Sequence, residues 1–97
     1  MAYELIFAPE AIDDLQRLTA ADRSGIRAAI ETHLRHQPRK ESKTRIKRLR
    51  GLRQPECRLR VDDFRVFYDV VEPQVHILAV IAKHLTYDWL EQHGIPL

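Results

Sequence analysis

The sequence predicts an α+β domain in which an N-terminal strand and an α-helical hairpin precede an antiparallel β-sheet and a short C-terminal helix. Two spacing patterns of apolar residues support this prediction. Apolar residues recur at helical spacing in the first third of the chain, and they alternate with polar residues at strand spacing after residue 57. A length of 97 residues fits one domain, residues 1–97, with a thin core.

The first predicted element is a strand over Tyr3–Phe7, which is short, apolar and aromatic. It stops before Pro9, whose missing N–H suits the first turn of a helix. The apolar positions of that helix are Ala11, Ile12, Leu15 and Leu18. A second helix follows Thr19, because Asp22 three residues later completes a capping box. Its apolar stripe, which ends before Pro38, comprises Ile26, Ala29, Ile30, His33 and Leu34.

The second half of the chain predicts a three-stranded meander. Residues 39–54 are basic and weakly periodic, so we expect a loop or a frayed strand there. Two-residue turns at Asp62-Asp63 and Glu72-Pro73 then separate three alternating segments. One face of this sheet is apolar and is expected to receive the helices. It comprises Cys57, Leu59, Val61, Phe64, Val66, Tyr68, Val70, Val75, Ile77, Ala79 and Ile81. A last helix over Tyr87–His93 ends at Gly94.

Charge is strongly segregated along the chain. The net charge is only +2, yet residues 39–60 hold ten Lys/Arg against two acids, and the other 75 residues hold six bases and twelve acids. Clustered cations gain affinity for polyanions by releasing counterions from phosphates. The pattern therefore predicts a nucleic acid, or an acidic protein that competes for the same surface, as the partner. The alternative is a solvated basic loop that binds nothing.

Several function classes are disfavoured. The longest uncharged run, residues 73–82, is far shorter than the roughly 20 apolar residues of a membrane helix, and the first residues do not resemble a secretory signal. We therefore expect a cytoplasmic protein without membrane contact. The single cysteine, Cys57, allows no internal disulfide. No metal-ligand spacing and no glycine-rich phosphate loop occurs, so neither a metal nor a cofactor is expected.

The second face of the predicted hairpin carries Arg58, Arg60, Arg65 and Phe67. Strand parity places Arg60 directly opposite Arg65, and two like charges in this position repel unless an anion lies between them. Arginine forks match phosphate oxygens, which predicts a phosphate cradle. The alternative is a solvated face that acids neutralise. The acids in reach would be Asp62, Asp63 and Glu56. On the same face Asp69 is expected beside His76.

The segment after the last strand gathers Lys83, His84, Tyr87 and Trp89. These side chains can transfer protons, contact phosphate or stack on bases, and parity places His84 on the arginine face. Together they suit metal-free RNA cleavage, in which a 2′-hydroxyl attacks the neighbouring phosphate. An unperturbed pKa of about 6.5 suits His84 to the proton transfer.

The run Lys47-Arg48-Leu49-Arg50-Gly51, followed by Cys57-Arg58-Leu59-Arg60-Val61-Asp62-Asp63-Phe64-Arg65-Val66-Phe67-Tyr68-Asp69, resembles the hallmark of the RelE/ParE toxin superfamily. The opening strand and helical hairpin resemble it too, so the resemblance covers most of residues 1–90. It implies a RelE-like microbial RNase fold and a toxin of a bacterial type II toxin–antitoxin pair. Cys57 and Asp62-Asp63 depart from the usual aromatic residue and glycine-containing turn.

The resemblance also implies roles for individual residues. The three arginines match the basic sheet positions of RelE-like nucleases, and His84, with Lys83 beside it, matches the late cationic position. The C-terminal tyrosine of the pattern has Tyr87 nearby, although Leu90 stands at the strict position. The candidate catalytic residues are therefore Arg58, Arg65, Lys83, His84 and Tyr87. The candidate RNA-binding residues are Lys43, Arg45, Lys47, Arg48, Arg50 and Arg60.

The leading hypothesis is a RelE-like, metal-independent endoribonuclease that cuts mRNA in the ribosomal A site and thereby inhibits translation. A cognate antitoxin would hold it inactive in a hetero-oligomer by covering its apolar rim or its basic face. ParE-like members of the superfamily instead poison DNA gyrase, which is the first alternative. The second is a nontoxic relic that binds RNA without cutting it.

Overall fold

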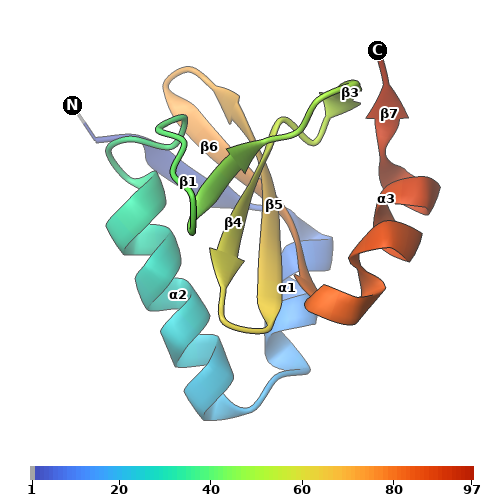
Figure 1. Cartoon of the computed structure of the whole chain (residues 1–97). Coiled ribbons are helices and arrows are strands. Elements are labelled where there is room, and N and C mark those ends of the chain that lie inside the picture. The colour runs from blue at the N-terminus through green and yellow to red at the C-terminus, as the bar shows by residue number, and fades with distance from the viewer. Residues whose placement is uncertain (1) are drawn as a thin grey trace.

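The computed structural model describes residues 2–97 and confirms the α+β class (Figure 1). The helices are α1 (Pro9–Gln16), α2 (Ala20–Leu34), the short 3₁₀ helix η1 (Lys83–Leu85) and α3 (Thr86–His93). The strands are β1 (Glu4–Phe7), β2 (Ile46–Arg48), β3 (Leu52–Gln54), β4 (Cys57–Val61), β5 (Phe64–Val71), β6 (Gln74–Ala82) and β7 (Ile95–Pro96). The segment 39–54, expected to be a loop or a frayed strand, thus contains two short strands.

The main sheet has the order β1-β6-β5-β4-β2, and β3 pairs with β7 in a separate ribbon. The predicted antiparallel pairing holds for β4, β5 and β6, whereas β1 pairs with β6 in parallel. Both two-residue turns are confirmed, because Val61 pairs with Phe64 and Val71 with Gln74. Asp62 takes a positive φ of 50° in the first turn, a conformation that aspartate tolerates better than most residues.

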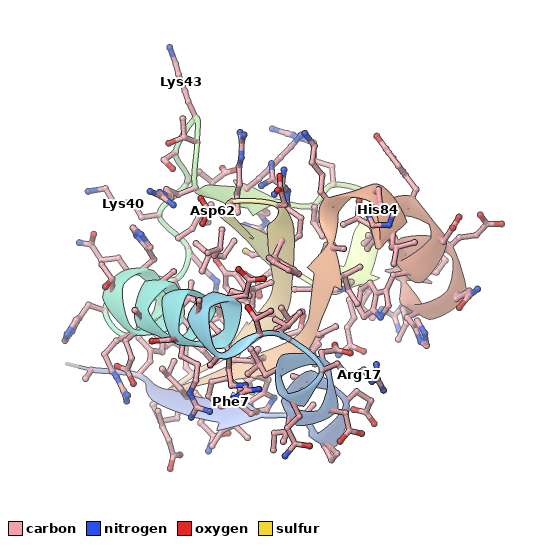
Figure 2. All side chains as sticks on the ribbon, turned by 90° about the horizontal axis from the view of Figure 1, so that it is seen from below. Phe7, Arg17, Lys40, Lys43, Asp62 and His84 are labelled. Atoms are coloured by element: carbon pink, nitrogen blue, oxygen red, sulfur yellow. The ribbon has the colours of Figure 1, made fainter. Side chains whose placement is uncertain are left out.

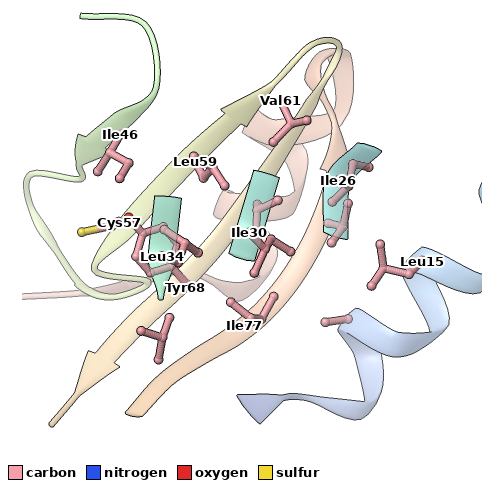
Figure 3. Close-up of a cluster of buried hydrophobic side chains, with 14 of the residues drawn as sticks. Leu15, Ile26, Ile30, Leu34, Ile46, Cys57, Leu59, Val61, Tyr68 and Ile77 are labelled. Atoms are coloured by element: carbon pink, nitrogen blue, oxygen red, sulfur yellow. The ribbon is translucent and has the colours of Figure 1, made fainter. Parts of the chain in front are cut away.

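The hydrophobic core lies between the α1–α2 hairpin and one face of the sheet (Figure 3). Thr19 caps α2 as predicted, since its hydroxyl accepts a hydrogen bond from the Asp22 N–H at 3.1 Å. Cys57 is buried here, and burial raises the pKa of its thiol to about 11. The prediction that Ile12 belongs to the buried apolar stripe of the first helix is wrong. Its side chain is 44% exposed, because Ala11 and Leu15 occupy the buried face of the short helix α1.

A β-bulge in β6 overturns part of the predicted apolar face. Tyr68 pairs with Ile77 and Phe67 with Ala79, so Leu78 is an extra residue that reverses the alternation. Val80 therefore joins the core. Ala79 and Ile81, expected on the core face, lie on the opposite one.

The last helix also departs from the prediction that all helices cover one face. The Trp89 ring of α3 stacks on Phe67, with centroids 4.7 Å apart and planes 12° from parallel. Phe67 alternates with the core residues Val66 and Tyr68, so it points to the opposite face. The helix α3 thus covers part of the second face and leaves Phe67 only 1% exposed.

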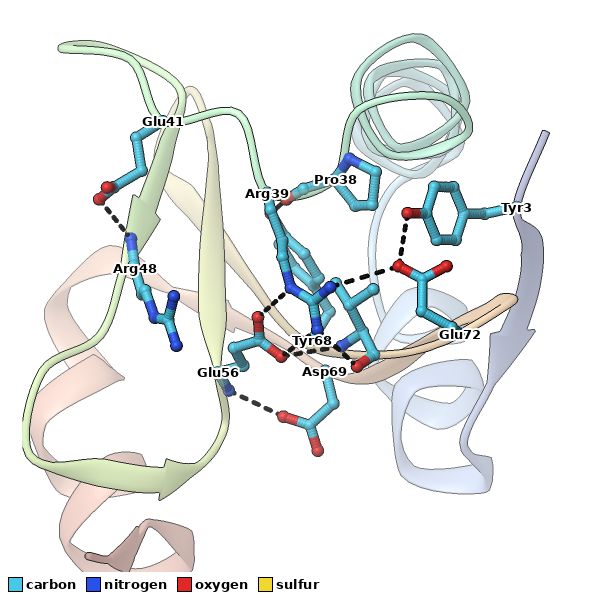
Figure 4. A network of polar contacts seen from close by, with 10 residues as sticks. Tyr3, Pro38, Arg39, Glu41, Arg48, Glu56, Tyr68, Asp69 and Glu72 are labelled. Carbon is cyan, nitrogen blue, oxygen red and sulfur yellow. Dashed lines mark hydrogen bonds and ion pairs between the residues drawn. The ribbon is translucent and has the colours of Figure 1, made fainter. Parts of the chain in front are cut away.

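A polar network anchors the start of the basic segment to the sheet (Figure 4). The Arg39 guanidinium donates to the Glu56 carboxylate at 2.6 Å and to the Val70 carbonyl at 3.1 Å. The Glu56 N–H in turn donates to Asp69 at 2.8 Å. Asp69 pairs with His76 in the strand register as expected, but the polar contact of the His76 ring at 2.8 Å is with Gln74.

We expect Glu56→Gln to lower the free energy of unfolding at pH 7 by about 1 kcal/mol. Burial acts to raise the pKa of Glu56, but hydrogen bonds from Arg39 and Val70 and the charges of Arg39 and Arg48 outweigh it and lower the pKa below 4.5. A carboxylate with a lowered pKa stabilises the fold above its unfolded pKa and loses this contribution as the pH falls through the folded value. Urea titrations should therefore show a difference at pH 7 that shrinks below pH 4.5.

Glu72→Gln is the matched control, since the Glu72 side chain is 61% exposed and its contact with Arg39 is longer, at 3.3 Å. We expect a smaller effect from it. An equal loss from both variants, or a Glu56→Gln loss that persists unchanged at low pH, would contradict this assignment.

Candidate functional site

Strand register brings five cations onto the second sheet face, and we call this group the cationic face. Arg60 pairs with Arg65 as predicted, and Lys47 of β2 pairs with Arg58. The Arg60 N–H donates to the Arg45 carbonyl at 2.8 Å, which adds Arg45 to the same row. Paired side chains of neighbouring strands have their Cβ atoms about 5 Å apart. The cationic face therefore comprises Arg45, Lys47, Arg58, Arg60 and Arg65.

Arg65 is fixed within this face and is only 8% exposed. Its Nη1 donates to the carbonyls of Asp62 and Phe64, both at 2.9 Å, so the side chain braces the β4–β5 turn. Burial lowers the pKa of Arg65, and the nearby charges of Arg58 and Arg60 lower it further. Arg65 therefore has a structural role beside any catalytic one, which makes it an ambiguous probe of function.

Arg58 is the most unusual member of the cationic face. Its Nη1 is buried and has no hydrogen-bond partner among residues 2–97. Burial, followed by the charge of Arg60, lowers the pKa of Arg58. A buried donor without a partner costs free energy, so an anion that reached it would be stabilised.

Within residues 2–97 the arginines of the cationic face make no ion pair. In the described part of the chain, the arginines in ion pairs are Arg17, Arg35 and Arg39. Glu56 is held by Arg39, and Asp62 contacts Arg65 through its backbone carbonyl. The neutralised-face alternative is therefore wrong for Glu56, whereas Asp62 lines a hollow together with Arg45 and Arg60, and the charge of Asp63 acts on Arg65. Guanidinium groups gathered on one face without ion pairs suit a phosphate-bearing ligand.

The proposed proton-transfer residues lie next to the β4–β5 turn. The Lys83 N–H donates to the Asp63 carbonyl at 2.7 Å, which fixes η1 against this turn. Figure 2 shows Asp62 and His84 on the side of the molecule away from Phe7 and Arg17. His84 is exposed, and Tyr87 is 87% exposed.

The structure separates the candidate RNA-binding residues into groups. Arg45, Lys47 and Arg60 belong to the cationic face, and Lys43 projects from the preceding loop (Figure 2). Arg48 alternates to the other side of β2, and Arg50 lies in the β2–β3 turn. The contacts of all these residues with RNA remain predictions.

Sequence reasoning missed two features beside this face. The stack of Trp89 on Phe67 occupies a ring that had been a candidate for stacking on a base. A groove of about 580 Å³ runs between α1 and α3, and its lining includes Asp14, Leu78 and Trp89 but no residue of the cationic face. Both depend on the bulge at Leu78 and on the placement of α3, for which the sequence carries only the weak signal of Trp89 and His93 at helical spacing.

Two further findings concern residues 2–97. They contain no group of three His, Cys, Asp or Glu side chains placed to hold a metal ion. None of their helices has the length and apolar character needed to cross a membrane.

A family model decides the classification. The model of the ParE toxin of the type II toxin–antitoxin system, parDE, matches residues 5–84. The chain belongs to this toxin family. The match contains the whole cationic face together with Lys83 and His84, and it stops before Tyr87. It confirms the RelE/ParE resemblance found in the sequence. No match is found among curated protein sequences.

Solved RelE toxins share the fold of this ParE-family chain. The RelB–RelE complex of Pyrococcus horikoshii matches with a TM-score of 0.70 at 23% identity over 86% of this chain and 97% of that one. The complex of Methanococcus jannaschii gives 0.67 at 23% identity over 87% and 96%. The RelBE2 complex of Mycobacterium tuberculosis gives 0.60 at 23% identity over 84% and 99%. Each of these solved structures is a toxin–antitoxin complex.

Proposed function

We propose that this type II toxin is a ribosome-dependent mRNA endoribonuclease that needs no metal ion and inhibits translation. The observation that carries the proposal is the cationic face, where the buried Arg58 Nη1 has no partner and Arg60 is exposed and makes no ion pair within residues 2–97. A sheet face that holds repelling cations is poorly suited to the free protein and well suited to a bound phosphodiester.

The reaction removes one proton from the 2′-hydroxyl and delivers one proton to the leaving 5′-oxygen. The 2′-oxygen of one nucleotide forms a bond to the neighbouring phosphorus as a base removes its proton, and the bond from phosphorus to the 5′-oxygen breaks as an acid protonates that oxygen. The products are a 2′,3′-cyclic phosphate and a 5′-hydroxyl. His84 and Tyr87 are the candidates for proton transfer. Arg58, Arg65 and Lys83 stabilise the charge that develops on the phosphoryl oxygens, and Arg60 binds the strand.

The proposal includes a cytoplasmic setting and a cognate antitoxin. The structural neighbours are toxins in complex with antitoxins, which supports a partner of this kind. Occupation of the A site would supply the mRNA in a fixed pose, and the antitoxin would prevent access by covering the toxin in a hetero-oligomer.

Inhibition of DNA gyrase is the second candidate function. It is favoured by the family model, which is that of the ParE toxins. In this case the exposed cations of the same face would contact protein or DNA, and no RNA chemistry would be required of His84.

Induced expression without antitoxin in a bacterial host separates these functions. The proposal predicts growth arrest with cuts at codon-positioned sites in translated mRNA and with intact chromosomal DNA. Arrested growth with intact mRNA and accumulated DNA breaks would contradict the nuclease and support inhibition of DNA gyrase. Normal growth with intact mRNA would contradict both toxic activities and support the third hypothesis, a nontoxic relic that binds RNA without cutting it.

A further inference from the structure

A second basic surface lies around the β2–β3 turn and the β3–β7 ribbon. Leu52 of β3 pairs with Pro96, and the Leu97 N–H donates to the Gly51 carbonyl at 3.2 Å. Two hollows of about 460 and 450 Å³ meet here and share Arg48, Leu49, Leu52 and Leu97 in their linings. Because they share this lining, the hollows form one surface. We call it the leucine–arginine patch, which comprises Arg48, Leu49, Arg50, Leu52, Arg53 and Leu97.

The apolar part of the patch is partly exposed. The Leu97 side chain is 83% exposed, and Leu49 and Leu52 are only half-buried. Three leucines that line adjoining hollows offer aliphatic surface whose burial by a partner would be favourable.

The charged part of the patch is free to pair. Arg48, Arg50 and Arg53 are exposed and make no ion pair within the described residues 2–97. Two carboxylates line the same hollows (Figure 4): Glu56, which pairs with Arg39 at 2.6 Å, and Glu41, which accepts a hydrogen bond from the Arg48 backbone N–H at 2.9 Å. The patch thus joins three exposed guanidinium groups that make no ion pair to aliphatic side chains.

The patch is distinct from the cationic face. Within β2, Lys47 pairs with Arg58 on the cationic face, whereas Arg48 pairs with the core residue Cys57 and so alternates to the other side. A ligand of the patch need not therefore compete with RNA on the cationic face.

We propose that the leucine–arginine patch docks an acidic segment of the antitoxin, one that carries aliphatic side chains between its carboxylates. This inference rests on the proposed function, which requires an antitoxin. Arginine forks bind carboxylates in bidentate fashion, and aliphatic side chains of the segment would fill the hollows over Leu49, Leu52 and Leu97. RNA fits the patch less well, because none of the six patch residues is an aromatic ring on which an unpaired base could stack.

The test uses the antitoxin that neutralises this toxin when co-expressed, with affinity measured by calorimetry on full-length proteins. Arg50→Glu/Arg53→Glu is expected to weaken the complex about tenfold or more, and this difference should diminish at high salt. Leu97→Asp is expected to weaken it about tenfold at every salt concentration. The matched control is Arg17→Glu/Lys40→Glu, which makes the same change in charge outside the patch and should bind as the wild type does.

The outcomes separate the patch from the function. Unchanged affinity in both patch variants, with a neutralising antitoxin in hand, would overturn the patch proposal alone. A toxin for which no neutralising partner exists would overturn the proposed function and the patch together. A third readout is binding of a single-stranded RNA oligonucleotide. If Arg50→Glu/Arg53→Glu weakened RNA binding and left the antitoxin affinity unchanged, the patch would be an RNA surface.

Discussion

Arg58→Met is expected to abolish toxicity and to make the protein more stable at the same time. Loss of one charge-stabilising donor from the reacting phosphate should reduce mRNA cleavage by about 100-fold or more. The substitution also removes a buried Nη1 that has no partner and a charge that repels Arg60 and Arg65. Methionine keeps the apolar stem, so the free energy of unfolding should rise by about 1 kcal/mol.

Two measurements check this prediction on one set of proteins. Urea denaturation gives the free energy of unfolding, and induced expression gives growth inhibition and mRNA cleavage. Arg17→Met is the control, because the Arg17 side chain is 75% exposed at the C-cap of α1 and lies outside the cationic face. It should change neither quantity. A toxic Arg58→Met protein would remove Arg58 from the site, and an unfolded one would contradict the predicted gain in stability.

Phe67→Ala is expected to lower the free energy of unfolding by about 3 to 4 kcal/mol. Phe67 is only 1% exposed, and its ring is covered by Trp89. Trp89→Ala should cost about 2 kcal/mol, since it removes the same stack from the other side. The double variant should cost clearly less than the sum of the two, because residues in direct contact are coupled.

Tyr87→Ala serves as the control for this pair. Tyr87 belongs to the same helix but is 87% exposed, so its removal should cost less than about 0.5 kcal/mol. Strictly additive effects of Phe67→Ala and Trp89→Ala would contradict the packing of α3 on the second sheet face.

Local sequence patterns predicted the helices and strands better than they predicted which side of the sheet each residue occupies. The turns at Asp62-Asp63 and Glu72-Pro73 have two residues each, so they fix the strand register directly, and the opposition of Arg60 and Arg65 follows from it. The bulge at Leu78 leaves no local signal, and it reverses the faces of Ala79 and Ile81. The position of α3 depends on the contact between Phe67 of β5 and Trp89 of α3. No periodic pattern in the sequence relates residues of two different elements.

The candidate site shows the same division. Alternation within β4 and β5 was sufficient to place Arg58, Arg60 and Arg65 on one face. The basic segment before them has no clear period, so the sequence could not show that Lys47 joins this face while Arg48 turns away from it. The sequence also could not show which arginine pairs with Glu56, because that partner is Arg39, which lies 17 residues away in the sequence.

The chemical nature of the ends in cleaved mRNA tests the central claim most directly. RNA from cells that express the wild-type toxin would be ligated selectively to adaptors that accept either a 5′-hydroxyl or a 5′-phosphate. Attack by the 2′-hydroxyl predicts toxin-dependent 5′-hydroxyl ends with matching 2′,3′-cyclic phosphates, and their absence in the Arg58→Met strain. Ends that carry a 5′-phosphate and a 3′-hydroxyl, or no new ends during growth arrest, would contradict metal-independent cleavage by this cationic face.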